Sequence, residues 1–164
     1  MSRFFFLLAV AAGAFATSAR AENPVSTDAV QRGRYVAMIG GCNDCHTPGY
    51  APNSGKAPES QWLTGDALGF AGPWGTTYAP NLRLKLTSMD LATFKAYARS
   101  LQTRPPMPYW ALNAMSEADL EALYAFVHSL GPAGQSAPTA LPPGVAAKGP
   151  VVQWPAPPAQ MVAR

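Results

Sequence analysis

The chain has 164 residues, 48% of them hydrophobic and 13% charged, and carries a formal net charge of +3. Arg3 and Arg20 lie in an N-terminal segment that we expect to be removed, and without them ten basic side chains face nine acidic ones, a net charge of +1. The length fits one domain, and the near-neutral charge does not favour nucleic acid or an anionic membrane as a partner, since either would need a clustered basic face.

The first 21 residues have the pattern of a signal peptide. A positive start is followed by an uninterrupted apolar run over residues 4–16, which is shorter than the roughly 20 residues that a helix needs to cross a bilayer. Residues 19–21, Ala-Arg-Ala, match the small-x-small pattern read by signal peptidase, so we expect cleavage after Ala21 and export to the periplasm. The alternative is a retained membrane anchor. No later stretch approaches spanning length, and we expect no membrane span after cleavage.

The next segment predicts a helix that begins at Ser26 or Thr27, either of which can cap it. Its apolar positions are Val30, Val36, Ala37 and Ile39. Gly40 and Gly41 end this helix and lead the backbone into a tight turn before the two cysteines of the chain.

Cys42-Asn43-Asp44-Cys45-His46 is the most informative stretch of the sequence. A disulfide would be the default pairing in an exported protein, but the histidine directly after the cysteines favours another interpretation. Two thiols separated by two residues can reach both vinyl groups of one haem, and the histidine then binds its iron. A thioredoxin-like pair would need a βαβ setting, and a zinc site would need a second ligand pair. We therefore predict one covalently attached haem c, held by Cys42 and Cys45 with His46 as an iron ligand.

Residues 47–81 hold glycine, proline and aromatic side chains without helical or alternating periodicity, which predicts an ordered loop. Loops of this length in a compact domain mainly serve a site. The aromatic residues are Trp62, Phe70, Trp74 and Tyr78, and such a content is unusual in a flexible connector. We expect this loop to lie against a large apolar group.

A second helix is predicted from about Met89 to Ser100, begun by Thr87 or Ser88. Its apolar face contains Leu91, Phe94, Ala98 and Leu101. The helix stops before Arg104-Pro105-Pro106, where the prolines favour an extended path.

Met107, set between prolines, is the candidate for the sixth iron position. A rigid backbone suits a ligand, and a thioether favours the ferrous state and so raises the reduction potential. The alternative is that Met107 fills the core. Other candidates are Met38, Met89, Met115 and His128. The first two lie within helical patterns, where packing is the expected role, and the histidine falls in the last turn of a helix, where it commonly interacts with exposed carbonyls.

A third helix is predicted from Ser116, its cap, to Leu130-Gly131-Pro132, with Asp119 completing an approximate capping box. Its apolar positions are Leu120, Leu123, Tyr124 and Val127. Residues 131–164 contain eight prolines, which favours an extended tail and excludes a helix or a central strand. Disorder is the alternative, but Val151, Val152 and Trp154 indicate that part of the tail docks.

Taken together, these motifs resemble a class I cytochrome c. The resemblance covers about residues 28–130 and rests on Gly33, Tyr35, residues 42–47, 78–82 and 107–108, and residues 116–120 leading to Tyr124 and Leu130. It implies an all-α fold with three main helices around one haem and a long ordered middle loop.

The same resemblance implies that the first and last helices cross, a small residue such as Gly33 meeting an aromatic one such as Tyr124. It also implies that the Pro80 carbonyl accepts a hydrogen bond from the His46 ring. Within the family, residues 62–65 and 75–81 resemble the modules that serve periplasmic dehydrogenases. We divide the chain into a signal peptide (1–21), a cytochrome c domain (22–130) and a proline-rich tail (131–164).

The predicted function is one-electron transfer between redox partner proteins, a dehydrogenase donor, a terminal oxidase acceptor or both. Two histidines and scattered carboxylates supply no convincing acid, base and nucleophile set, so we expect a carrier rather than an enzyme. One alternative is a permanent subunit of a periplasmic dehydrogenase complex, docked by the tail. The other is a haem sensor or haem enzyme with an open iron position, in which Met107 would only pack.

Overall fold

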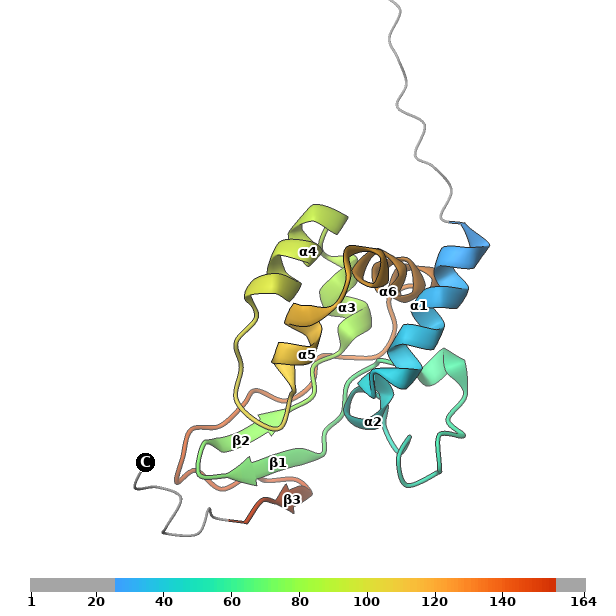
Figure 1. Cartoon of the computed structure of the whole chain (residues 1–164). Coiled ribbons are helices and arrows are strands. Elements are labelled where there is room, and N and C mark those ends of the chain that lie inside the picture. Colours follow the sequence, from blue (N-terminus) through green and yellow to red (C-terminus); the bar gives the residue numbers. More distant parts are fainter. Residues whose placement is uncertain (1–25, 156–164) are drawn as a thin grey trace, which may run out of the picture.

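The structure is a computed structural model that describes residues 26–155, so the predicted signal peptide lies outside the described residues. Within this range, helices occupy one end of the molecule and a three-stranded sheet closes the other (Figure 1). The elements are α1 (Thr27–Ile39), α2 (Cys42–His46), a 3₁₀ turn (Glu59–Gln61), β1 (Gly69–Gly72), β2 (Gly75–Tyr78), α3 (Leu82–Thr87), α4 (Leu91–Ser100), α5 (Tyr109–Ala114), α6 (Glu117–Leu130) and β3 (Val151–Gln153).

The first helix forms where its capping signal predicts. The Ser26 hydroxyl accepts a hydrogen bond from the Ala29 amide at 3.1 Å, which satisfies one of the free amides of the first turn. The helix ends at Ile39, and Gly41 has a φ of 67°, a conformation that favours glycine. Gly40 and Gly41 form the predicted tight turn, and the two cysteines follow it in the short helix α2.

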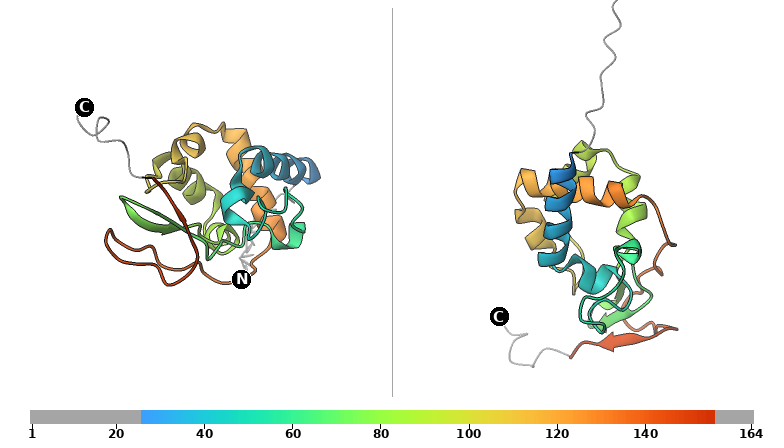
Figure 2. Two further views of the ribbon diagram at one scale, coloured as in Figure 1. Left: turned by 90° about the horizontal axis from the view of Figure 1, so that it is seen from below. Right: turned by 90° about the vertical axis from the view of Figure 1, so that its right-hand side faces the viewer.

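The last helix also forms as predicted, and α1 crosses it (Figure 2). A Cβ atom on Gly33 would overlap the carbonyl of Ala122 and crowd Phe126, so only glycine permits this close approach. The predicted crossing is therefore confirmed, but Gly33 meets Ala122 and Phe126 rather than Tyr124. The hydroxyl of Tyr124 instead donates to the Met89 carbonyl at 2.9 Å.

The middle segment is ordered, as predicted, but it is not a loop throughout. Strands β1 and β2 form an antiparallel hairpin in which Gly72 pairs with Gly75, so that Pro73 and Trp74 make the turn. Glycine-rich strands of four residues lack the apolar alternation that marks a half-buried strand, and the sequence therefore failed to predict them. Trp62, which precedes the hairpin, is buried in the core, as expected for an ordered segment.

The second predicted helix begins later than expected. Asp90 caps α4 by accepting a hydrogen bond from the Thr93 amide at 2.7 Å, and the preceding residues form a separate short helix, α3, which Asn81 caps through the Leu84 amide at 3.1 Å. Pro108 precedes a further short helix, α5. A proline is well tolerated at the start of a helix, so the extended path that the prolines predict is followed by a helix that the sequence did not predict.

The tail leaves α6 at Gly131 and runs to the outer side of the hairpin (Figure 1). Strand β3 pairs in parallel with β1, with Val151 opposite Gly69, and it lies at an edge of the sheet, where prolines nearby are tolerated. The described part of the tail is therefore docked and contains no helix. This sheet is an addition to the all-α arrangement that the sequence predicts, and a class I cytochrome c fold remains a prediction.

The core lies where the helices meet each other and the middle segment. Its buried apolar side chains include Val36, Ala37, Trp62, Leu63, Leu86, Phe94, Leu120, Leu123, Phe126 and Val127. No helix in residues 26–155 is both long enough and apolar enough to cross a membrane.

Candidate functional site

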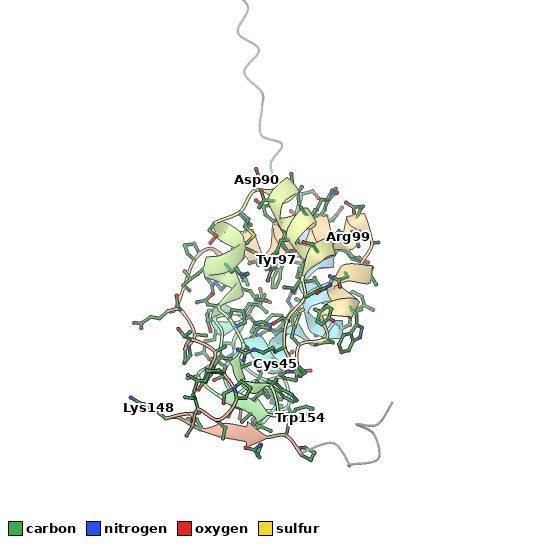
Figure 3. All side chains as sticks on the ribbon, turned by 90° about the vertical axis from the view of Figure 1, so that its left-hand side faces the viewer. Cys45, Asp90, Tyr97, Arg99, Lys148 and Trp154 are labelled. Atoms are coloured by element: carbon green, nitrogen blue, oxygen red, sulfur yellow. The ribbon has the colours of Figure 1, made fainter. Side chains whose placement is uncertain are left out.

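A cavity lies between the helices and the hairpin. Its wall is mostly apolar and comes from the hairpin, α3, α4, α5 and α6; it includes Phe70, Tyr78, Leu82, Leu86, Phe94, Tyr97, Leu101, Leu112 and Leu123. Cys42, Cys45 and His46 line the same cavity, as do Met107 and Met115. Figure 3 shows Cys45 between the helices and the sheet, with Tyr97 of α4 above it. The cavity therefore gathers residues that lie far apart in the sequence.

Helix α2 places the two thiols on one face because they are three residues apart. Both cysteines are free, so the disulfide alternative is not realised in this structure. Burial raises the pKa of Cys42 to about 11, and burial, followed by the charges of Asp44 and Asp66, raises the pKa of Cys45. Thiols with raised pKa values are protonated at neutral pH, which differs from the activated thiolate of a thioredoxin-like pair.

His46 is 5% exposed, and its Nδ1 atom lies 2.8 Å from the carbonyl oxygen of Pro80. The predicted contact is therefore confirmed. Because Nδ1–H donates to this carbonyl, Nε2 is the ring nitrogen left free as a ligand. Burial lowers the pKa of His46, and the hydrogen bond to Pro80 opposes this effect. The result favours a neutral imidazole, the form that binds a metal.

Thr47, next to this histidine, fixes the orientation of α2. Its hydroxyl donates to the Asn43 side-chain oxygen at 2.7 Å and accepts from the Leu63 amide at 2.8 Å. Both Asn43 and Thr47 are buried, and Gly65 adds a bond from its amide to the His46 carbonyl at 2.8 Å. The sequence analysis did not predict a structural role for Asn43. Its position between the two cysteines was the only feature of the sequence that could have indicated this role.

Met107 lies half-buried between two prolines and faces the cavity. Its loop is tied to the hairpin, because the Thr77 hydroxyl donates to the Pro105 carbonyl at 2.7 Å. Met115, which follows α5, also lines the cavity. The structure thus brings two thioethers to the cavity that the Cys-x-x-Cys-His helix borders.

The remaining ligand candidates lie elsewhere in the described chain. Met38 is 42% exposed on α1, and Met89 packs against the core. His128 lies with its Nε2 atom 3.2 Å from the Leu86 carbonyl and its ring 3.9 Å from that of Tyr124, measured between centroids. Met89 and His128 therefore have packing or hydrogen-bonding roles, whereas Met38 lies exposed and outside the core where packing was expected.

The donor set and the wall fit a haem. A porphyrin is large and apolar, and the wall offers aromatic and aliphatic side chains. Two free thiols and a neutral imidazole are the groups that a haem attached at a Cys-x-x-Cys-His motif requires, and a thioether is a ligand suited to its sixth iron position. Residues 26–155 contain no cluster of three or more His, Cys, Asp and Glu side chains that could hold a metal ion directly. In its residue types and their arrangement, the site resembles that of a c-type haem module.

Comparison with known proteins agrees with this class. The chain is 32% identical over 139 residues to the cytochrome c subunit of a quinone-type alcohol dehydrogenase from Gluconacetobacter polyoxogenes, covering 77% of this chain and 28% of that protein. It is 28% identical over 142 residues to the gluconate 2-dehydrogenase cytochrome c subunit of Pantoea cypripedii, covering 79% and 30%. It is 28% identical over 121 residues to the fructose dehydrogenase cytochrome subunit of Gluconobacter japonicus, covering 68% and 22%.

The chain spans less than a third of the length of these relatives. No family model matches it, and no solved structure matches it significantly. The similarities support a cytochrome c-like module, and with it haem and electron transfer.

Proposed function

We propose that this chain is an exported monohaem cytochrome of class I type that carries one electron at a time between redox partners. Cys42 and Cys45 attach haem c covalently, and His46 and Met107 bind its iron. The observation that carries the proposal is the shared cavity: the Cys-x-x-Cys-His helix and the Met107 loop border one apolar space. A bound haem supplies reversible one-electron chemistry at its iron.

The protein's own residues hold the cofactor and set its properties. Pro80 orients the His46 imidazole through Nδ1, which makes Nε2 a stronger donor. The apolar wall excludes water from the cavity and disfavours the more highly charged oxidised state, and a thioether ligand acts in the same direction. Both effects raise the reduction potential. A dehydrogenase as donor, a terminal oxidase as acceptor, or both, would be the partners in the periplasm.

A second candidate function is a permanent subunit of a periplasmic dehydrogenase complex. It is favoured by the relatives, which are cytochrome subunits of gluconate, alcohol and fructose dehydrogenases. The docked tail bears on this alternative because β3 pairs with the chain's own β1. That edge of β3 is therefore not free to pair with a partner protein. If the full-length protein from its native host elutes alone during size exclusion, the free carrier is supported; elution with a dehydrogenase supports the subunit.

The test of the proposed function is an absorption spectrum of the purified holoprotein, oxidised and reduced, with and without carbon monoxide. A carrier keeps a six-coordinate, low-spin spectrum in the reduced state and resists carbon monoxide. Immediate binding of carbon monoxide would instead indicate a sensor or an enzyme with an open iron position. A colourless protein at the mass of the bare polypeptide would refute the proposal.

Covalent attachment has its own test. In Cys42→Ala or Cys45→Ala, one of the two thioether bonds cannot form, so maturation should be impaired. Acidified acetone should leave the haem on the parent protein. Extraction of the haem by acidified acetone would contradict covalent attachment at this motif.

A further inference from the structure

Arg104 connects the Met107 loop to two other segments of the chain. Its Nη1 atom donates to the Trp74 carbonyl in the hairpin turn at 2.8 Å and to the Leu141 carbonyl in the tail at 2.9 Å. The side chain is half-buried and lines the cavity. Hydrogen bonds from a charged donor are stronger than those between neutral groups, so these bonds hold the loop firmly against the hairpin and the tail.

The acceptor in the tail is itself well fixed. Leu141 and Thr76 exchange two backbone hydrogen bonds, of 2.8 and 3.0 Å. Gly75 has a φ of 94°, and a Cβ atom there would overlap the Leu141 carbonyl, so the glycine is what allows the tail to approach. Further along, Trp154 packs edge-on against Trp74, with ring centroids 6.1 Å apart. The tail is therefore a fixed support behind the hairpin (Figure 2).

From this geometry we propose that Arg104 is a positioning residue for Met107, and that the docked tail supports the sulfur ligand through it. This inference rests on the proposed function, in which Met107 binds the haem iron. Arg104 lies three residues before Met107, and the Thr77 hydroxyl holds Pro105 between them. The loop is thus fixed on its N-terminal side by one charged and one neutral donor. Loss of the charged donor frees the sulfur to leave the iron.

The other thioether at the cavity offers a matched control. Arg99 donates from Nη1 to the carbonyls of Asn113 and Met115, both at 2.6 Å, and from Nη2 to Glu117. An arginine thus holds the segment of each of the two methionines. Of these two arginines, only Arg104 contacts the tail. Substitution of Arg99 removes an arginine of the same kind without touching the Met107 loop.

The experiment compares Arg104→Gln, Arg104→Lys, Leu141→Pro and Arg99→Gln with the parent holoprotein, each checked for covalent haem and for helical content. The readouts are the sulfur-to-iron charge-transfer band of the ferric protein and the equilibrium binding of carbon monoxide to the ferrous protein. Arg104→Gln should weaken the band and raise apparent carbon monoxide affinity about tenfold, as loss of roughly one charged hydrogen bond predicts. Arg104→Lys should restore most of the parent behaviour, because an ammonium can still reach the carbonyls.

Leu141→Pro tests the tail with Arg104 intact. It removes the amide that donates to Thr76 and should change both readouts in the same direction as Arg104→Gln, with a double variant no worse than the stronger single one. Because Leu141→Pro leaves Arg104 in place, it still tests the inference if Arg104→Gln fails to fold. An unchanged band and unchanged carbon monoxide binding in both variants would overturn the inference.

Two other results would also overturn it. A shifted reduction potential with the band intact in Arg104→Gln would mean that the arginine acts through its charge and not on the ligand. Loss of the band in Arg99→Gln alone would make Met115 the ligand. Failure of the proposed function is distinguishable, because the parent protein itself would then lack haem or lack the band.

Discussion

The Nδ1 atom of His46 lies 2.8 Å from the carbonyl oxygen of Pro80, although the two residues are 34 positions apart. Gly65 lies between their segments: its amide donates to the His46 carbonyl, and a Cβ atom on it would lie 2.7 Å from the Asn81 amide nitrogen. We expect Gly65→Ala to push the Pro80 segment away and weaken the bond to His46. A less basic imidazole stabilises ferric iron less well, so the reduction potential should rise in a redox titration of the holoprotein.

Gly144→Ala is the control for this prediction. Gly65 and Gly144 have similar φ values of 78° and 81°, but a Cβ atom on Gly144 would meet nothing within 4 Å. Both variants therefore carry the backbone cost of a left-handed alanine, and only Gly65→Ala adds the collision. Equal potentials in the two variants would show that the Pro80 contact does not tune the iron.

Replacement of the sulfur ligand is the second prediction. Met107→Ala should leave haem attached, open the sixth position of the iron to carbon monoxide and lower the reduction potential, because a neutral soft donor that favours ferrous iron is lost. Met115→Ala, which removes the other thioether at the cavity, should keep the parent spectrum. Spectra that change only in Met115→Ala would move the ligand assignment to that residue.

The sequence predicts best those features that have local signals. Helices α1 and α6 form as expected because a serine caps each start, glycine follows each end and apolar residues repeat at helical spacing. The cysteines and His46 belong to one contiguous motif, and flanking prolines mark Met107. The haem-binding roles of these residues remain predictions, although all of them line one cavity.

Other features depend on contacts that no local pattern reports. Strand β1 of the hairpin pairs with β3 through backbone bonds between residues about 80 positions apart; Gly69, for example, lies opposite Val151. Short helices beside prolines, such as α5, give too few turns for periodicity to be recognised. Arg104 has no local signal at all, since its acceptors are backbone carbonyls of two distant segments. Such long-range backbone contacts explain most of the differences between the predicted and the observed fold.

The crossing of α1 and α6 supports a third prediction. In Gly33→Ala the new methyl group would overlap the Ala122 carbonyl, and the two helices would have to separate. We expect a loss of about 1–3 kcal/mol in the free energy of unfolding, the usual range for overpacking, measured by denaturant titration of the holoprotein. Gln31→Ala, on the exposed face of α1, should stay within about 0.5 kcal/mol of the parent. Equal stabilities of the two variants would contradict the close contact.

Asp119 gives a prediction for the pH dependence of stability. It pairs with Arg32 across the α1–α6 interface at 2.8 Å, and the hydrogen bond from Arg32, followed by that with Ser116, lowers the pKa of Asp119. A carboxyl whose pKa is lower in the folded state stabilises the protein above its unfolded pKa, and this contribution is lost as pH falls through the folded value. Unfolding titrations should therefore show Asp119→Asn less stable than the parent at neutral pH and equal to it in acid.

Arg32→Gln tests whether the pairing is the cause. If Arg32 lowers the pKa of Asp119, the acid-dependent part of the stability should shrink in Arg32→Gln, and adding Asp119→Asn should then change little. An undiminished effect of Asp119→Asn in that background would assign it to the side-chain hydrogen bond between Ser116 and the Asp119 carboxyl instead.

Asn81 holds both the start of α3 and the start of the tail. Its side-chain oxygen accepts from the Leu84 amide at 3.1 Å, and its Nδ2 donates to the carbonyls of Ala133 at 2.7 Å and Gln135 at 3.1 Å. Because the residue is 4% exposed, Asn81→Ala would leave these groups without partners. We expect a loss of about 1–3 kcal/mol in the free energy of unfolding, with faster hydrogen exchange in β3.

Asn81→Asp separates the two roles. It keeps the oxygen that caps α3 but turns the donor to the tail into a second oxygen, which faces two carbonyl oxygens. A buried carboxylate oxygen that faces carbonyl oxygens and has no donor is costly, and protonation relieves the cost, so the deficit of Asn81→Asp relative to the parent should be large at neutral pH and shrink in acid. Exchange in β3 should follow the same pH trend while α3 remains protected. Uniform loss of protection in both segments would mean that the cap, and not the bond to the tail, dominates at this position.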